Sequence, residues 1–275
     1  MTSTPKLKAP PGTCDTHMHV YEPGYPTRPE VAKPPVAPVG DYLKLCKRLG
    51  ITRTVFVQPN AYGADNTCML AAMKTYGPNA RGVAVVTPQI TDADLDRLTR
   101  AGIRAIRFML LPGGPLSWDV FDTLTARVHQ FGWNVNLQID GRTFAEREAQ
   151  LRRVRGDLVI DHVGKFLEPV PVDHPGFKAV LRLLETGRTW VKLSAPYEVS
   201  RTGGPLYADV GALAKALVKA APERMLWASN WPHPSAKPEH MPDDAELLDL
   251  LLDWAPDEAT RRKILVDNPA RLYGF

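Results

Sequence analysis

The chain has 275 residues, of which 44% are hydrophobic and 23% are charged, with 34 basic and 30 acidic side chains. This length and composition argue against a disordered polypeptide and allow a domain with a sizeable core. The formal net charge of +4 is mild and the basic residues are scattered, which argues against the dense basic stripe of a nucleic-acid-binding protein.

Neither a membrane span nor a secretion signal is recognisable in the sequence. No apolar run approaches the roughly 18 to 20 residues of a spanning helix, and the N-terminus lacks an apolar signal segment. The three cysteines, Cys14, Cys46 and Cys68, show no disulfide framework and no zinc-ribbon spacing. We therefore expect a cytoplasmic protein with reduced, mostly buried thiols and no membrane partner.

Proline is unevenly distributed: nine of the 26 prolines precede Gly40. This density excludes regular structure over most of the segment, apart from a short extended stretch at residues 13–20. We expect an N-terminal arm over residues 1–12, a folded domain over residues 13–275, and a long first loop after the extended stretch. Long loops in compact domains are often functional.

From residue 13 onward, short runs rich in β-branched or apolar residues alternate with segments of helical periodicity. The eight runs cover residues 13–20, 52–57, 82–86, 103–108, 133–139, 158–163, 189–193 and 225–228. The helical segments include residues 67–76, 92–101, 119–131, 145–154, 177–186, 208–220 and 245–254. This alternation predicts an α/β fold, a single-domain (β/α)8 barrel of the TIM type. An open doubly wound sheet is the alternative, but no GxGxxG motif follows a strand.

In such a barrel, the catalytic residues lie at the carboxyl ends of the strands. The first run contains Asp15, His17 and His19, whose alternation predicts that the three side chains share one face. The sixth run ends in Asp161-His162-Val163-Gly164-Lys165, and the eighth is followed by Asn230-Trp231-Pro232-His233. Together these strand-end motifs are far more specific than any one of them.

The combination resembles the amidohydrolase superfamily, from Asp15 to Tyr273. More narrowly, it is similar to the branch of 2-pyrone-4,6-dicarboxylate lactonases, L-fuconolactonases and D-galactarolactone isomerases, and most similar to the last of these. The resemblance implies a (β/α)8 fold and attack at the lactone carbonyl of a carboxylate-bearing substrate. It also implies a catalytic cluster and two carboxylate-binding arginines. The cluster comprises His17, His19, His162 and Asn230, and the arginines are Arg107 and Arg201.

One departure from the hydrolytic members bears on the reaction. Those members carry an aspartate before Trp-Pro-His, as a general base or metal ligand, whereas this chain has Asn230. An amide has no useful basicity and binds zinc poorly. Acyl migration between two hydroxyls of one bound sugar acid needs no activated water, so it tolerates this loss better than hydrolysis does. The isomerase type can lack the first histidine of the HxH pair, whereas His17 and His19 are both present in this chain. The assignment within the branch is therefore open.

Three imidazoles can supply the acid/base steps. We expect His162 to donate to the lactone carbonyl or ring oxygen while His17 or His19 accepts a proton, because imidazole ordinarily titrates near working pH. Asp15 is either a substitute base or a residue that orients a histidine. His17, His19 and His162 are also the metal ligands if zinc binds, but without a carboxylate at position 230 we expect no cofactor.

Other polar residues near strand ends are candidates for binding substrate. Arg107, near the end of an otherwise apolar strand, suits a carboxylate, whereas we expect Arg104 to have a structural role. The remaining candidates are Arg201, Gln58, Asn60, Tyr25, Lys165 and His233.

These observations predict an enzyme that rearranges or opens the lactone of a sugar diacid or related dicarboxylate, with isomerisation favoured. The alternatives are a lactonase that hydrolyses a dicarboxylate lactone and a non-catalytic barrel that binds a small anion. The expected partner is a small carboxylate-bearing lactone, with a homo-oligomer possible and no role for nucleic acid.

Overall fold

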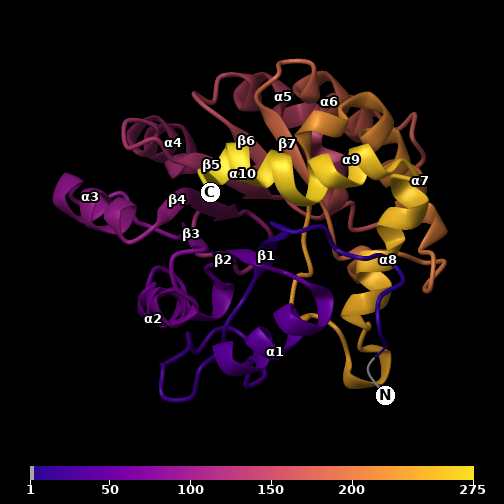
Figure 1. Cartoon of the computed structure of the whole chain (residues 1–275). Coiled ribbons are helices and arrows are strands. Elements are labelled where there is room, and N and C mark those ends of the chain that lie inside the picture. Colours follow the sequence, from indigo (N-terminus) through magenta and orange to yellow (C-terminus); the bar gives the residue numbers. More distant parts are fainter. Residues whose placement is uncertain (1–2) are drawn as a thin grey trace.

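Eight parallel strands follow one another around a barrel, each paired with the next strand of the chain (Figure 1). The structure is a computed structural model that describes residues 3–275. The strands are β1 Cys14–Met18, β2 Arg53–Val57, β3 Ala80–Ala84, β4 Ile103–Met109, β5 Asn134–Gln138, β6 Leu158–Ile160, β7 Thr189–Leu193 and β8 Met225–Trp227. The predicted (β/α)8 barrel is thereby confirmed.

The barrel is nearly closed between β1 and β8 just beyond the end of β8. There the backbone N–H of Asn230 donates to the carbonyl of His17 at 2.8 Å, and the N–H of His19 donates to the carbonyl of Trp231 at 2.8 Å. The segment that follows β8 is therefore fixed beside the histidines of β1.

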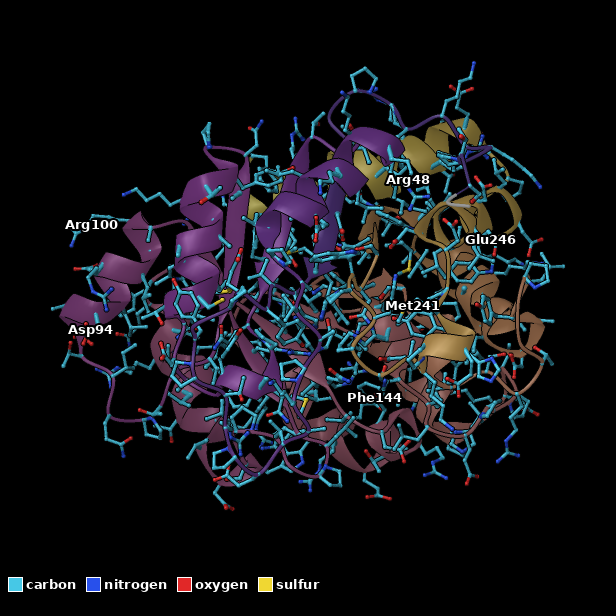
Figure 2. All side chains as sticks on the ribbon, turned by 90° about the horizontal axis from the view of Figure 1, so that it is seen from below. Arg48, Asp94, Arg100, Phe144, Met241 and Glu246 are labelled. Carbon is cyan, nitrogen blue, oxygen red and sulfur yellow. The ribbon has the colours of Figure 1, made fainter. Side chains whose placement is uncertain are left out.

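Helices cover the outside of the strands (Figure 1). They are α1 Val39–Leu49, α2 Thr67–Tyr76, α3 Asp92–Arg100, α4 Phe121–His129, α5 Phe144–Arg152, α6 Pro175–Leu184, α7 Ala208–Ala220, α8 Asp244–Trp254, α9 Glu258–Arg262 and α10 Asn268–Tyr273. Figure 2 shows Asp94 and Arg100 of α3 at the outer edge of the molecule, away from the packed centre. No helix within residues 3–275 is long and apolar enough to cross a membrane.

The period-two alternation of strands divides the apolar residues between two cores. On β4, Ile106 and Phe108 pack outward against the helices, whereas Ala105 belongs to a smaller cluster inside the barrel. Arg107, two residues beyond Ala105, consequently lies on the inner face, near the carboxyl end of the strand. The same alternation on β7 places Lys192 on the inner face, two residues beyond Trp190 of the inner cluster.

The C-terminal segment, for which no element was predicted, covers one end of the barrel. Figure 1 shows α9 and α10 crossing in front of the strands. The fully buried Tyr273 of α10 packs in the inner cluster with Cys14, Val55 and Trp190. The carboxyl ends of the strands lie at the opposite end of the barrel, which α10 leaves uncovered.

The described part of the N-terminal arm runs beside α8 (Figure 1). Backbone N–H groups of Ser3 and Leu7 each donate at 2.8 Å, to the carboxylates of Asp243 and Asp249 respectively. Residues 1–2 of the predicted arm lie outside the described residues. The long first loop is pinned at its base by an antiparallel bridge between Tyr21 and Ala37.

Three strands differ by two residues or more from their predicted bounds. The first strand ends at Met18 instead of residue 20. The sixth strand ends at Ile160 instead of residue 163, because His162 and Val163 adopt left-handed backbone conformations with φ of 54° and 55°. The third strand begins at Ala80 instead of residue 82, because Ala80 already pairs with Thr54 of β2.

Candidate active site

A cavity of about 280 Å³ opens where the carboxyl ends of the strands meet. Its volume lies at the small end of the range for ligand sites, which suits a compact molecule. Its polar lining comes from β4, β5 and the segments after β1, β2, β6, β7 and β8. The main polar lining residues are His19, Tyr21, Asn60, Arg107, Gln138, His162, Lys165, Glu198, Asn230 and Ser235.

Asp15 does not share the face of the two histidines, contrary to the alternation predicted from the sequence. The pairing of β1 with β2 is irregular between Asp15 and Met18, so the period-two pattern is interrupted there. The fully buried Asp15 carboxylate accepts hydrogen bonds from Tyr42 of α1 at 2.8 Å and from the backbone of Ser229 at 3.0 Å. Burial raises the pKa of Asp15 to about 6. The contacts give Asp15 a structural role, joining β1 to α1 and to the segment after β8.

His17 and His19 are hydrogen-bonded to each other, with 3.2 Å between their Nε2 atoms. Nδ1 of His19 lies 2.8 Å from the carbonyl oxygen of Val57, so Nδ1 carries the hydrogen and Nε2 of the neutral ring is an acceptor. His17 therefore donates from Nε2, and its bare Nδ1 accepts from the ammonium of Lys192 at 3.1 Å. Both Nε2 atoms are thus engaged, and neither is free to act as a base.

Lys192, which the sequence analysis missed, lies at the centre of this inner cluster. Its fully buried ammonium donates to Asn136 Oδ1 at 2.6 Å and lies 3.1 Å from Asp161 Oδ1. Burial by itself raises the pKa of Asp161, but the nearby cations, Lys192 foremost, bring it below its ordinary value. The signal for Lys192 was present in the sequence as a lysine within the apolar run of residues 189–193.

All three site histidines are neutral at neutral pH. Burial, assisted by Arg107, lowers the pKa of His19 to about 3. Burial and nearby cations also lower the pKa of His17 and His162 well below the ordinary value. The expectation that these imidazoles titrate near working pH was therefore wrong, because a buried ring cannot readily become charged beside Lys192 and Arg107.

His162 is the histidine with a ring nitrogen available to the cavity. Its Nδ1 lies 2.8 Å from the hydroxyl of Ser194, whereas its Nε2 has no hydrogen-bond partner among the described residues. The side chain is aimed by a left-handed backbone at His162, a conformation that Asn230 shares with φ of 58°. Such backbone conformations are costly for residues other than glycine and cluster at functional sites.

Arg107 is buried, with 5% of its surface exposed, and makes no ion pair with any described residue. Its two Nη atoms donate to the carbonyl of Gln58 at 2.7 Å and to Gln138 Oε1 at 3.0 Å. Its Nε has no partner within residues 3–275. A buried guanidinium without a carboxylate partner is the arrangement expected of an anion-binding residue.

Asn230 also lines the cavity. Its Nδ2 donates to the hydroxyl of Tyr197 at 2.8 Å and lies 3.5 Å from Glu198 Oε1. Tyr197 in turn lies 3.0 Å from Nδ1 of His233. Tyr197 and Glu198 come from the short turn η5 (Pro196–Glu198) after β7, and the sequence analysis assigned neither of them a role.

Glu198 is the one carboxylate among the described residues that line the cavity. It forms an ion pair with Lys165 and accepts a hydrogen bond from Ser235. With Lys33, Arg107 and Lys165 on the same lining, positive charges exceed negative ones by two (3 − 1 = 2). The cavity therefore favours an anionic ligand.

The structure brings some of the other predicted residues to the cavity and leaves others outside it. Asn60 and Lys165 line the cavity. Gln58 does not, because its amide nitrogen donates to the backbone of Gly63 and Asp65. Tyr25 packs against Tyr62 at 6.4 Å between ring centroids.

Arg201 and His233 also lie off the cavity lining. The Arg201 side chain is 73% exposed and approaches Glu168 at 4.0 Å, so it does not form the second carboxylate clamp in this conformation. His233 is buried behind Tyr197, where it contacts Asp244 instead of the cavity. The two positions were chosen from motif similarity, which does not fix the direction of a loop side chain.

Three side chains near the cavity have the ligand types and the spacing of a metal site. Ligand atoms of His17, Asp161 and His162 lie within 4.8 Å of one another, and the Nε2 of His19, also a predicted ligand, is bonded to His17. Both His17 Nδ1 and Asp161 Oδ1 lie 3.1 Å from the ammonium of Lys192. With Arg107 also nearby, the buried cations already outnumber the single carboxylate. A divalent ion would add charge to a positive cluster, so the described residues do not fit one.

Comparisons with known proteins find similar sequences and a similar fold. A family model described as amidohydrolase matches residues 14–275. A D-galactarolactone isomerase of Agrobacterium fabrum is 39% identical, covering 98% of this chain and 94% of that protein. A 2-pyrone-4,6-dicarboxylate hydrolase of Comamonas testosteroni is 36% identical, covering 98% and 93% respectively. An apo crystal structure from Agrobacterium tumefaciens superposes with a TM-score of 0.93, at 39% identity and 98% coverage of each chain.

Proposed function

Because the chain belongs to the amidohydrolase family, as its strand-end motifs predicted, we propose that it is an enzyme acting on the lactone of a sugar diacid or related dicarboxylate. Isomerisation of the lactone is the favoured reaction. The observation that carries the proposal is the buried guanidinium of Arg107, which has no ion-pair partner within residues 3–275, in the same cavity as His162 and Asn230. The cation holds a carboxylate, and the two other side chains face the reacting atoms.

In the proposed reaction, Arg107 fixes the substrate carboxylate and places the lactone carbonyl near His162. A hydroxyl of the same substrate attacks the carbonyl carbon, and the bond from that carbon to the ring oxygen breaks. Nε2 of His162 receives the proton of the attacking hydroxyl and returns it to the leaving oxygen. The low pKa of His162 makes it a weak base, but the attacking group is already bound and benefits from a high effective concentration.

Hydrolysis of the lactone is the second candidate function. Glu198 supplies a carboxylate to the cavity, and a lactone hydrolase is among the relatives. The carboxylate is, however, engaged by Lys165, Ser235 and Asn230, which leaves it poorly placed to activate water. Isomerisation needs no such activation and therefore ranks first.

The proposal includes neither a metal nor another cofactor, because the ammonium of Lys192 lies 3.1 Å from both His17 Nδ1 and Asp161 Oδ1, where a metal ion would have to bind. A small carboxylate-bearing lactone is the proposed partner. The three cysteines are free and buried, which supports the proposed cytoplasmic location.

Product analysis by NMR tests the function. Incubation of galactaro-1,5-lactone with the enzyme is expected to yield a 1,4-lactone before any open diacid. If open diacid is the sole first product, the reaction is hydrolysis and the proposal of isomerisation is wrong. Lack of turnover across a panel of dicarboxylate lactones would leave only the non-catalytic alternative. Activity that is lost on chelation and restored by zinc would overturn the cofactor-free proposal.

A further inference from the structure

A line of four side chains leads from the start of α8 to Asn230 in the cavity. Asp244 Oδ1 lies 3.1 Å from His233 Nε2, and His233 Nδ1 lies 3.0 Å from the hydroxyl of Tyr197. The same hydroxyl lies 2.8 Å from Asn230 Nδ2. We call Asp244, His233 and Tyr197 the relay. None of the three lines the cavity, so they act on it only through Asn230.

The polarity of the two hydrogen bonds at Tyr197 follows from the carboxylate that faces His233 at the outer end of the relay. Asp244 is paired on its other oxygen with Arg48 at 3.8 Å, and an ionised carboxylate can only accept. The carboxylate favours the His233 tautomer that carries its hydrogen on Nε2, facing Asp244, although this contact lacks the geometry of a hydrogen bond. In that tautomer Nδ1 is an acceptor. Tyr197 consequently donates its hydroxyl hydrogen to His233 Nδ1.

The inner end of the relay then sets the orientation of the Asn230 amide. The Tyr197 oxygen, having donated its hydrogen, accepts one from Asn230 Nδ2. The second hydrogen on Nδ2 faces Glu198 Oε1 at 3.5 Å. The opposite orientation of the amide would place its oxygen beside the Glu198 carboxylate, oxygen against oxygen. The acceptors at both ends therefore favour the same orientation of the amide.

We infer that the relay fixes Asn230 with its amide nitrogen turned away from the cavity and Oδ1 turned towards it, so that Asn230 accepts a hydrogen bond from a substrate hydroxyl. Tyr197, His233 and Asp244 are positioning residues, and the role assigned to the substrate hydroxyl rests on the proposed function. In this arrangement Asn230 aligns the attacking hydroxyl without removing its proton, which passes to His162. The orientation also explains how an aspartate at position 230 would present a basic oxygen to the same point.

Side-chain NMR tests the orientation without any substrate. In protein labelled with 15N-asparagine, the Nδ2 signals of Asn230 are identified by their absence from Asn230→Ala. Because both hydrogens have acceptors, their exchange with water is expected to be at least about tenfold slower than that of the exposed Asn79. Tyr197→Phe removes one acceptor and should accelerate the exchange of the Asn230 amide hydrogens. Tyr207→Phe is the control and should not change the exchange, because the Tyr207 hydroxyl makes no hydrogen bond among the described residues. Fast exchange in the native enzyme overturns the orientation.

A double-mutant cycle tests the positioning role. Tyr197→Phe is expected to lower kcat about tenfold with little change in KM, and to have no further effect on kcat in an Asn230→Ala background. Equal losses in both backgrounds would show that Tyr197 does not act through Asn230. If the native enzyme turns over no lactone, the proposed function fails, while the exchange measurement still decides the orientation.

Discussion

Arg107 and Asn230 have different roles in the cavity because their hydrogen bonds to the protein leave different polar atoms available to a substrate. Arg107 keeps unpaired N–H groups for an anion after its bonds to Gln58 and Gln138. Asn230 has both amide hydrogens directed at protein oxygens. One side chain therefore binds charge, and the other aligns a hydroxyl.

Asn230→Asp should increase hydrolysis relative to isomerisation. The substitution puts a basic oxygen beside the bound lactone, where it can activate water; general base catalysis contributes roughly 10²- to 10⁴-fold. We expect the ratio of open diacid to isomerised lactone, measured by NMR, to rise by roughly tenfold or more. Asn60→Asp adds the same charge elsewhere on the cavity lining and should leave the ratio unchanged. A ratio that rises equally in both variants would attribute the effect to charge alone.

Arg107→Gln should weaken substrate binding. Loss of a charge-assisted pair with a carboxylate costs about 1.5–3 kcal/mol, which corresponds to a decrease in kcat/KM of roughly 10- to 150-fold. Steady-state kinetics should show the loss mainly as a higher KM. Arg104→Gln on the same strand is the matched control, because Arg104 is bound to the backbone of Thr99 and Ile103. Similar losses in both variants would mean that Arg107 supports the strand instead of the substrate.

At the scale of elements, the inner face of β7 joins strands that are distant in the sequence. Lys192 on β7 contacts Asn136 on β5, His17 on β1 and Asp161 just after β6. The ammonium thereby fixes the tautomer of His17 and balances the charge of Asp161. Burial of such a cation costs free energy. Its removal is nevertheless destabilising, because the buried carboxylate partner is then left unpaired.

Lys192→Met should lower the free energy of unfolding by about 3–5 kcal/mol. Urea denaturation measures the loss, and Lys215→Met, which breaks an exposed pair with Asp253, should cost no more than about 1 kcal/mol. In the double variant Lys192→Met, Asp161→Asn the orphaned charge is gone, so part of the stability should return. A double variant no more stable than Lys192→Met would contradict the charge argument.

At the scale of the whole molecule, burial of the site links stability to pH. The pKa of His17, His19 and His162 is lowered in the folded protein, so below about pH 6.5 the unfolded chain binds protons that the folded protein excludes. Each such histidine makes the free energy of unfolding fall as the pH falls. Asp15 acts in the opposite sense between its ordinary value of 3.8 and about 6, because there the folded protein holds a proton that the unfolded chain releases.

His19→Asn should flatten the acid side of the stability profile. For His19 the window runs from 6.5 down to a folded pKa of about 3, and the variant removes this contribution of about 1.4 kcal/mol per pH unit. Asparagine can retain the hydrogen bond to Val57. Urea denaturation at pH values from about 4 to 7 measures how steeply the free energy of unfolding depends on pH. An unchanged slope would show that His19 is not held neutral by the fold.

The sequence by itself determined the barrel and the motifs at its mouth. Alternating strands and helices, and the identities of His162 and Asn230 at strand ends, are local patterns that need no knowledge of distant partners. The left-handed turn at residues 162–163 escaped prediction, since no glycine or turn motif marks either position.

The tertiary structure decided what those side chains can do. The contact between Lys192 and His17 joins residues 175 positions apart, and the low pKa of His19 depends on burial and on Arg107. The direction of the Asn230 amide depends on acceptors at both ends of the relay. Arg201 and Tyr25 lie off the cavity lining because loop side chains follow tertiary contacts. Burial, charge balance and hydrogen-bond direction are properties of the assembled barrel, so no local pattern encodes them.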